Sequence, residues 1–185
     1  MSLTPSNMLS LGTKAPDFKL FDTISSKNYH LNDLKGKNGT LIMFICNHCP
    51  YVIHVNPMIT EIASTYQKKG IGFTAISSND VVNYPQDAPH LMKEIGLTKA
   101  YTFPYLYDET QVVAKAYDAA CTPDFYLFDS NLELVYRGQL DNSRPGNNIP
   151  LTGIDLKNAL NNLLDNTPIS INQKPSMGCN IKWFK

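Results

Sequence analysis

A short apolar run that ends in a Cys-x-x-Cys motif is the feature that most limits how this chain can fold. Residues Leu41–Ile45 are apolar and β-prone, Cys46 and Cys49 follow, and the sequence from Pro50 has helical spacing. The two thiols are therefore predicted at a strand-to-helix junction, where the unpaired N–H groups and the macrodipole of the helix favour a thiolate. We expect Cys46 to be the acidified, attacking thiol and Cys49, one turn further on, to be the resolving thiol.

His48 lies between the two cysteines. Its imidazole can add positive charge or a hydrogen bond to a Cys46 thiolate, which would make the oxidised form easier to reduce. We therefore predict that His48 tunes the reactivity of the pair. Chemistry carried by two thiols requires no cofactor, and we expect none.

A Cys-x-x-Cys motif can also be half of a zinc site. The other cysteines, Cys121 and Cys179, stand alone and far apart, and the sequence contains neither a second Cys-x-x-Cys nor a His-x-x-x-His. Because structural zinc normally has four well-spaced ligands, we expect no metal. A purely structural disulfide is also disfavoured, because the N-terminus shows no export signal.

Length and charge narrow the possible functions further. The 185 residues suit a single domain spanning 1–185, with a core over about 10–165 and a C-terminal tail over 166–185. Sixteen basic residues balance sixteen acidic ones, so no broad charge favours nucleic acid or an anionic membrane. No run approaches transmembrane length. We expect a cytoplasmic protein, and a reducing compartment favours catalytic over structural cysteines.

The hydrophobic pattern predicts an alternation of strands and helices. We expect strands near Phe18 and Leu20, at Leu41–Ile45, at Ile71–Ser77 and, as an edge-like strand, at Tyr105–Tyr107, and a hairpin formed by Asp124–Asp129 and Leu132–Gly138. Helices are predicted at Tyr51–Lys69, Leu91–Ile95, Gln111–Tyr117 and Ile154–Leu164, and an irregular tail at Thr167–Lys185.

This order, with Cys-x-x-Cys after the first central strand, resembles the thioredoxin fold: an α/β fold with a central mixed sheet flanked by helices. The segment from Gly12 through Ala15, Pro16, Asp17 and Phe18 to Leu20 is similar to the entry segment of the redoxin superfamily. That superfamily joins alkyl hydroperoxide reductase and thiol-specific antioxidant proteins to thiol-disulfide oxidoreductases. The pairs Thr122-Pro123 and Arg137-Gly138 also fit its pattern.

The resemblance implies roles for further residues. Pro123 should be cis and face the active-site thiols, with the Thr122 backbone presented to a substrate cysteine or peptide. Peroxiredoxins carry a threonine three residues before the reactive cysteine, whereas this chain has Met43 there. The resemblance therefore places dithiol exchange ahead of peroxidase activity.

Three residues have two interpretations each. Cys121, two residues before Pro123, is either an extra resolving thiol or a small buried hydrophobic residue. Cys179 lies in a tail that either folds back over the active site or takes no part in turnover. Arg137 either has a functional role, in which it anchors a carboxylate or lowers a thiol pKa, or is a solvated hairpin charge.

The sequence thus predicts a thiol-disulfide oxidoreductase in which Cys46 and Cys49 exchange disulfides with protein partners and an unidentified electron donor. Its partners would include neither nucleic acid nor membrane, and its oligomeric state is not predicted. A thiol peroxidase that forms a cysteine sulfenic acid is the second hypothesis. A non-catalytic binding module is the third.

Overall fold

The computed structural model describes residues 3–184, which form two sheets and five α-helices. The strands are β1 (Leu3–Pro5), β2 (Lys19–Asp22), β3 (Lys27–His30), β4 (Gly39–Phe44), β5 (Ile71–Ser77), β6 (Tyr105–Tyr107), β7 (Cys121–Thr122), β8 (Asp124–Phe128), β9 (Leu134–Gly138) and β10 (Met177–Asn180). The helices are α1 (Leu31–Leu34), α2 (Pro50–Tyr66), α3 (Pro89–Thr98), α4 (Val112–Ala116) and α5 (Ile154–Leu164), with short 3-10 turns at Gln67–Lys69 and Pro85–Asp87.

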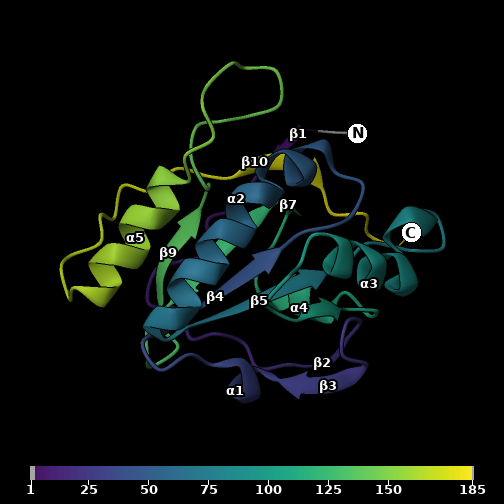
Figure 1. Cartoon of the computed structure of the whole chain (residues 1–185), viewed down its shortest axis with the longest axis horizontal. Coiled ribbons are helices and arrows are strands. Elements are labelled where there is room, and N and C mark those ends of the chain that lie inside the picture. Colours follow the sequence, from purple (N-terminus) through teal and green to yellow (C-terminus); the bar gives the residue numbers. More distant parts are fainter. Residues whose placement is uncertain (1–2, 185) are drawn as a thin grey trace.

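The main sheet is mixed and has β4 near its centre. Its strand order is β3-β2-β6-β5-β4-β8-β9, with β4 parallel to β5 and antiparallel to β8 (Figure 1). Helix α2 connects β4 to β5, as the spacing of the two predicted strands required. The α/β class, the central mixed sheet and the β8–β9 hairpin are confirmed.

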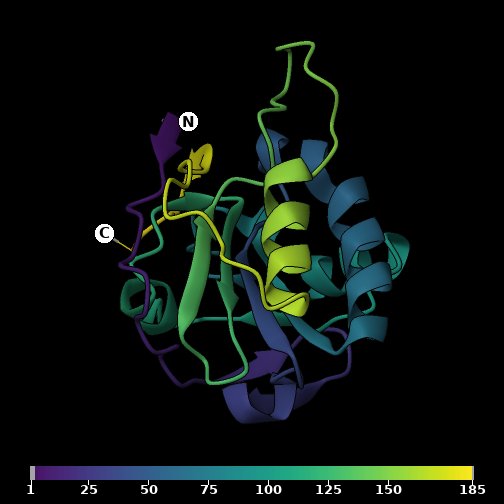
Figure 2. The same cartoon turned by 90° about the vertical axis from the view of Figure 1, so that its left-hand side faces the viewer.

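Both faces of β4 are buried, which explains why its sequence lacks polar alternation. Leu41 and Met43 belong to the core on one face, which α2, α3 and α5 cover. Ile42 and Phe44 belong to the core on the other face, which α1 and α4 cover. Figure 2 shows α2 and α5 side by side on one face of the sheet. The strand that precedes the cysteines is therefore held rigidly from both sides.

The prediction that β6 is edge-like is wrong. Strand β6 pairs in parallel with β5 and antiparallel with β2, so the β2–β3 hairpin forms that edge of the sheet. The short N-terminal strands carry too weak an alternation to indicate from sequence which strand they pair with.

The predicted irregular C-terminal tail is irregular over residues 167–176, but residues Met177–Asn180 form a strand. Strand β10 pairs antiparallel with β1 and with β7, and the three strands form a second, small sheet. Cys179 and Ile181 are buried. Strands β1 and β10, from opposite ends of the described chain, therefore pair with each other, and β10 also lies beside β7.

Gly178 allows β10 to approach β7 closely. A methyl group at this position would overlap the carbonyl oxygen of Thr122 and crowd the ring of Pro123. We expect Gly178→Ala to lower the free energy of unfolding by about 3 kcal/mol, because backbone atoms cannot move aside cheaply. Urea unfolding would measure this effect.

Gly146→Asn is the matched control for that substitution. No heavy atom lies within 4 Å of a Cβ at Gly146, and asparagine tolerates its positive φ of 79°. We expect a change below about 0.5 kcal/mol there. An equally small effect at Gly178 would contradict the close approach of β10.

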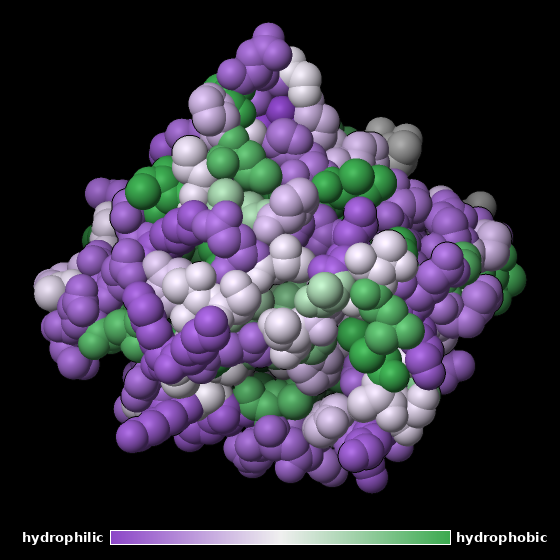
Figure 3. All heavy atoms as spheres, in the orientation of Figure 1, coloured by the Kyte–Doolittle hydropathy of each residue, from purple (hydrophilic) through white to green (hydrophobic). Residues whose placement is uncertain are grey.

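The surface shows small, separate groups of apolar side chains among hydrophilic ones on the face seen in Figure 3. Among residues 3–184, no helix has the length and apolar character needed to cross a bilayer.

Candidate active site

The Cys-x-x-Cys segment lies between β4 and α2. Strand β4 ends at Phe44, the N–H of Ile45 still bonds to the carbonyl of Ile76, and α2 begins at Pro50. Pro50 stands at the first helical position, where the missing N–H removes no hydrogen bond. Cys49 is consequently the N-cap of α2, and Cys46 lies three residues outside the cap.

The two sulfur atoms meet at Thr122. The Cys46 sulfur lies 3.4 Å from the Thr122 hydroxyl oxygen, and the Cys49 sulfur lies 3.2 Å from the Thr122 carbonyl oxygen. The Thr122–Pro123 peptide bond is cis, as the resemblance implied. None of the four cysteines, all of which lie within residues 3–184, forms a disulfide. The structure therefore brings Cys46, Cys49, Thr122 and Pro123 together, as predicted from the sequence.

The expected acidification of Cys46 is wrong, because the pair is polarised in the opposite sense. A hydrogen bond to Cys49, burial, and the negative charge of Asp87 raise the pKa of Cys46 well above its ordinary value. A hydrogen bond from Cys46 lowers the pKa of Cys49 to about 5, and further hydrogen bonds from Cys179 and the Val52 N–H outweigh the effect of burial. Helix α2 contributes one of these hydrogen bonds, because Cys49 is its N-cap and the Val52 N–H lies in its first turn.

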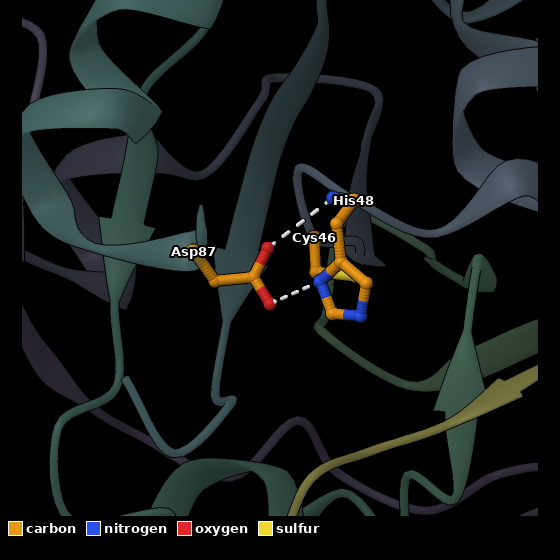
Figure 4. Close-up of side chains that lie close together, drawn as sticks. All are labelled: Cys46, His48 and Asp87. Atoms are coloured by element: carbon orange, nitrogen blue, oxygen red, sulfur yellow. Dashed lines mark hydrogen bonds and ion pairs between the residues drawn. The ribbon is translucent and has the colours of Figure 1, made fainter. Parts of the chain in front are cut away.

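His48 is held by a carboxylate that sequence reasoning missed. Its Nδ1 lies 2.7 Å from Oδ2 of Asp87, and its side chain is 16% exposed, whereas that of Asp87 is fully buried. Figure 4 shows the carboxylate directed at the imidazole, with the sulfur of Cys46 next to the ring. The predicted tuning residue is therefore itself positioned by a second residue.

Asp87 is an ionised, fully hydrogen-bonded carboxylate. Oδ1 accepts the N–H groups of Asn47 at 2.8 Å and His48 at 3.3 Å, and Oδ2 also accepts from the Asn79 side chain at 2.8 Å. Burial alone would raise the pKa of Asp87, but the hydrogen bonds from His48 and Asn79, the charge of His48 and the Asn47 N–H together lower it.

The position of Asp87 follows from the sheet. Strands β4 and β5 are parallel neighbours, with Phe44 beside Ile76, so the segments that leave their carboxyl ends lie at the same edge. One segment is the Cys-x-x-Cys loop, and the other is the polar stretch that contains Asp87. The predicted parallel pairing of these two strands could have pointed to this stretch. It does not identify which of the several polar residues in the stretch reaches His48.

Further contacts fix the two residues between the cysteines. Asn47 donates to the Gln86 carbonyl at 3.0 Å and accepts from the Tyr105 hydroxyl at 3.1 Å. The Tyr84 ring stacks on the His48 ring, with centroids 5.9 Å apart and an interplanar angle of 8°. The Cys-x-x-Cys loop is thus attached through both intervening residues.

Among residues 3–184, one group of three potential metal ligands converges. It consists of Cys46, His48 and Asp87, whose ligand atoms all lie within 4.8 Å of one another. The Asp87 and His48 atoms are joined by a 2.7 Å hydrogen bond, and the Cys46 sulfur contacts Thr122.

The Thr122 backbone is not presented to a substrate, contrary to what the resemblance implied. Strand β10 covers it, with Cys179 opposite Thr122 and Asn180 opposite Cys121. The tail therefore does fold back over this side of the active site. Sequence analysis missed the pairing because β10 is only four residues long and includes a glycine.

The remaining predicted residues take different positions. Burial raises the pKa of Cys121 strongly and that of Cys179 to about 12, with a hydrogen bond to Cys49 adding to the latter. Neither is therefore an ionised thiol at neutral pH. Arg137 donates to the Leu9 carbonyl and the Gln173 side chain, and these contacts attach β9 to the chain ends rather than tune a thiol.

Comparison with known proteins agrees with this geometry. Thiol-disulfide oxidoreductase ResA of Geobacillus thermodenitrificans (strain NG80-2) is 29% identical over 129 residues, which cover 69% of this chain and 68% of that protein. The crystal structure of an uncharacterized conserved protein from Geobacillus kaustophilus is 54% identical, with a TM-score of 0.98 over 100% of this chain and 97% of that one.

A more distant structure supports the fold alone. The thioredoxin domain of a thiol-disulfide oxidoreductase from Bacteroides vulgatus superposes with a TM-score of 0.59 at 19% identity, over 74% of this chain and 90% of that one. Residues 11–137 match the AhpC/TSA family. The chain is thus an oxidoreductase of the thiol-disulfide class with a thioredoxin-like fold, and it belongs to the AhpC/TSA family.

Proposed function

We propose that the protein exchanges disulfides with protein substrates through Cys46 and Cys49. The observation that carries this proposal is the geometry of the pair: two cysteines without a disulfide follow a central strand, and both sulfur atoms lie against Thr122, whose bond to Pro123 is cis. Such a pair has a nucleophile and a resolving thiol already in contact.

Cys46 is the thiol that attacks. Its residue is 2% exposed, whereas Cys49 is fully buried and lies between the Thr122 carbonyl and Cys179. The proton that Cys46 shares with Cys49 moves to Cys49 as Cys46 approaches the substrate. The Cys49 thiolate therefore acts as an internal base, and attack by Cys46 needs no ionisation in the resting state.

Exchange then proceeds in two steps. The Cys46 sulfur bonds to one sulfur of the substrate disulfide, and the other substrate sulfur leaves. Cys49 next attacks the Cys46 sulfur, which releases the second substrate sulfur and leaves a Cys46–Cys49 disulfide. Two electrons pass from the protein dithiol to the substrate, and the reverse sequence oxidises a substrate dithiol.

The reduced protein is expected to cleave the disulfides of a protein such as insulin, measured as released thiols or as precipitation of the separated chains. A parallel assay with hydrogen peroxide distinguishes the peroxidase hypothesis. Insulin cleavage with peroxide consumption at the background rate would support the proposal. Peroxide consumption without insulin cleavage would reject it.

A further inference from the structure

Asp87 has a role that the two-step exchange does not by itself explain. We infer that Asp87 is a positioning residue for thiol-disulfide exchange: it holds the His48 imidazole through Nδ1, so that Nε2 delivers protons to the departing substrate sulfurs. This inference rests on the proposed function and deepens it.

The first step of the argument is the direction of the hydrogen bond. An ionised carboxylate only accepts hydrogen bonds, so the 2.7 Å contact places a proton on Nδ1 of His48. Asp87 also accepts hydrogen bonds from the Asn79 side-chain amide and from two backbone N–H groups. All of these partners are donors, as an ionised carboxylate requires. With Nδ1 occupied, Nε2 is the ring nitrogen that exchanges protons.

The second step is the orientation of the ring. The carboxylate holds one edge of the imidazole and the Tyr84 ring covers a face, so its plane is fixed beside the Cys46 sulfur. In Figure 4, Nε2 lies on the side of the ring away from Asp87. The His48 side chain is 16% exposed, and in this proposal Nε2 faces the partner disulfide that approaches Cys46.

The third step is the proton balance. Reducing one disulfide releases two substrate thiolates, which need two protons. The dithiol supplies one, because Cys46 and Cys49 share a single proton. His48 supplies the other from Nε2–H in the first step, then takes the proton of Cys49 as that sulfur attacks and passes it to the second leaving sulfur. The ring ends neutral, and the products are two thiols and the Cys46–Cys49 disulfide.

A purely structural role is the competing explanation. Asp87 also bonds to the backbone N–H of Asn47 and to Asn79, so its removal disturbs the loop as well as the imidazole. A disturbed loop slows every reaction of Cys46. A misplaced proton donor slows only those reactions whose leaving thiolate needs a proton, because a weakly basic thiolate leaves unaided.

The test measures single-turnover exchange between the reduced protein and two small disulfides. Bis(2-hydroxyethyl) disulfide releases a strongly basic thiolate, and a nitro-substituted aromatic disulfide releases a weakly basic one. For Asp87→Asn we expect a loss of about tenfold or more with the first probe and less than about twofold with the second. His48→Gln should show the same selectivity, and the double variant should add little to either single variant.

Asp108→Asn is the matched control. Asp108 is also a buried carboxylate, but it accepts from the Ser78 hydroxyl and the N–H of Ala114, away from the thiols. Its removal should leave the ratio of the two rates unchanged. An equal loss with both probes for Asp87→Asn would overturn the inference. If the wild type reacted with neither probe, the proposed function itself would fail.

A measurement on the unaltered protein covers the case in which Asp87→Asn does not fold. Nitrogen NMR of the imidazole, recorded at a pH high enough to remove the Nε2 proton of His48, should show the neutral ring with its remaining proton on Nδ1. A neutral ring with its proton on Nε2 would contradict the hydrogen bond to an ionised Asp87 and would also overturn the inference.

Discussion

Replacement of Cys46 by serine is expected to lower the rate of disulfide exchange roughly a thousandfold or more, because a serine hydroxyl is not ionised at neutral pH and cannot form the mixed disulfide. The effect should appear with both insulin and small disulfides. The fold should persist, because serine is close in size and the hydroxyl of Thr122 lies within reach of the new side chain. Stopped-flow measurement of thiol release would give the rate.

Cys49→Ser should behave differently from Cys46→Ser. Attack by Cys46 still forms the mixed disulfide, but no second thiol resolves it, so the covalent complex should accumulate and be visible by mass spectrometry. Cys121→Ser is the matched control, because that thiol is buried and strongly disfavours ionisation. A trapped complex with Cys46→Ser and none with Cys49→Ser would reverse the two assigned roles. That outcome has to be tested, since Cys49 is the thiol with the lowered pKa.

The second large effect is expected at Asp124, which follows the cis-proline in β8. Burial raises the pKa of Asp124 to about 7, although hydrogen bonds from Ser6, Tyr126 and Phe125 oppose this effect. An unfolded aspartate has a pKa of about 3.9. Between these values the folded protein binds more protons than the unfolded chain. The stability that protonated Asp124 contributes is therefore complete below about pH 4 and is lost as the pH rises to about 7.

Asp124→Asn removes this loss, because the amide stays neutral at every pH. The free energy of unfolding of the variant minus that of the wild type is expected to increase by about 3 kcal/mol between pH 5 and pH 8. Urea unfolding at both pH values measures it, and groups that titrate in both proteins cancel in the difference. Asp165→Asn, at an exposed position, should show no such trend. A pH-independent difference at Asp124 would mean that its carboxyl group is ionised throughout.

Several parts of the fold could be predicted because their signals are local. The apolar run before Cys46 predicts a buried strand, and helical spacing predicts α2 and α5. In both cases neighbouring residues favour the conformation, so no knowledge of distant contacts is needed. The placement of Thr122-Pro123 opposite the thiols came from the family resemblance instead.

Other features depend on residues that are far apart in the chain. Strand β10 forms because Cys179 and Asn180 find a partner in β7, and Gly178 permits the close approach. The sequence around Cys179 has no alternation that would indicate this pairing. Sheet registers between distant segments are set by contacts that a local pattern does not contain.

The charges of the active-site groups also depend on contacts between residues that are far apart in the chain. The sequence by itself determined that two thiols and an imidazole would lie at the end of a central strand, and the family resemblance added the proline. Only the tertiary structure decided that Cys49 caps α2, that Asp87 reaches His48 from the end of the neighbouring strand, and that β10 covers Thr122. The reason is physical: a side chain's type is fixed by its sequence, but its pKa and hydrogen-bond partners depend on burial and on groups within a few ångströms, which folding brings together from distant parts of the chain.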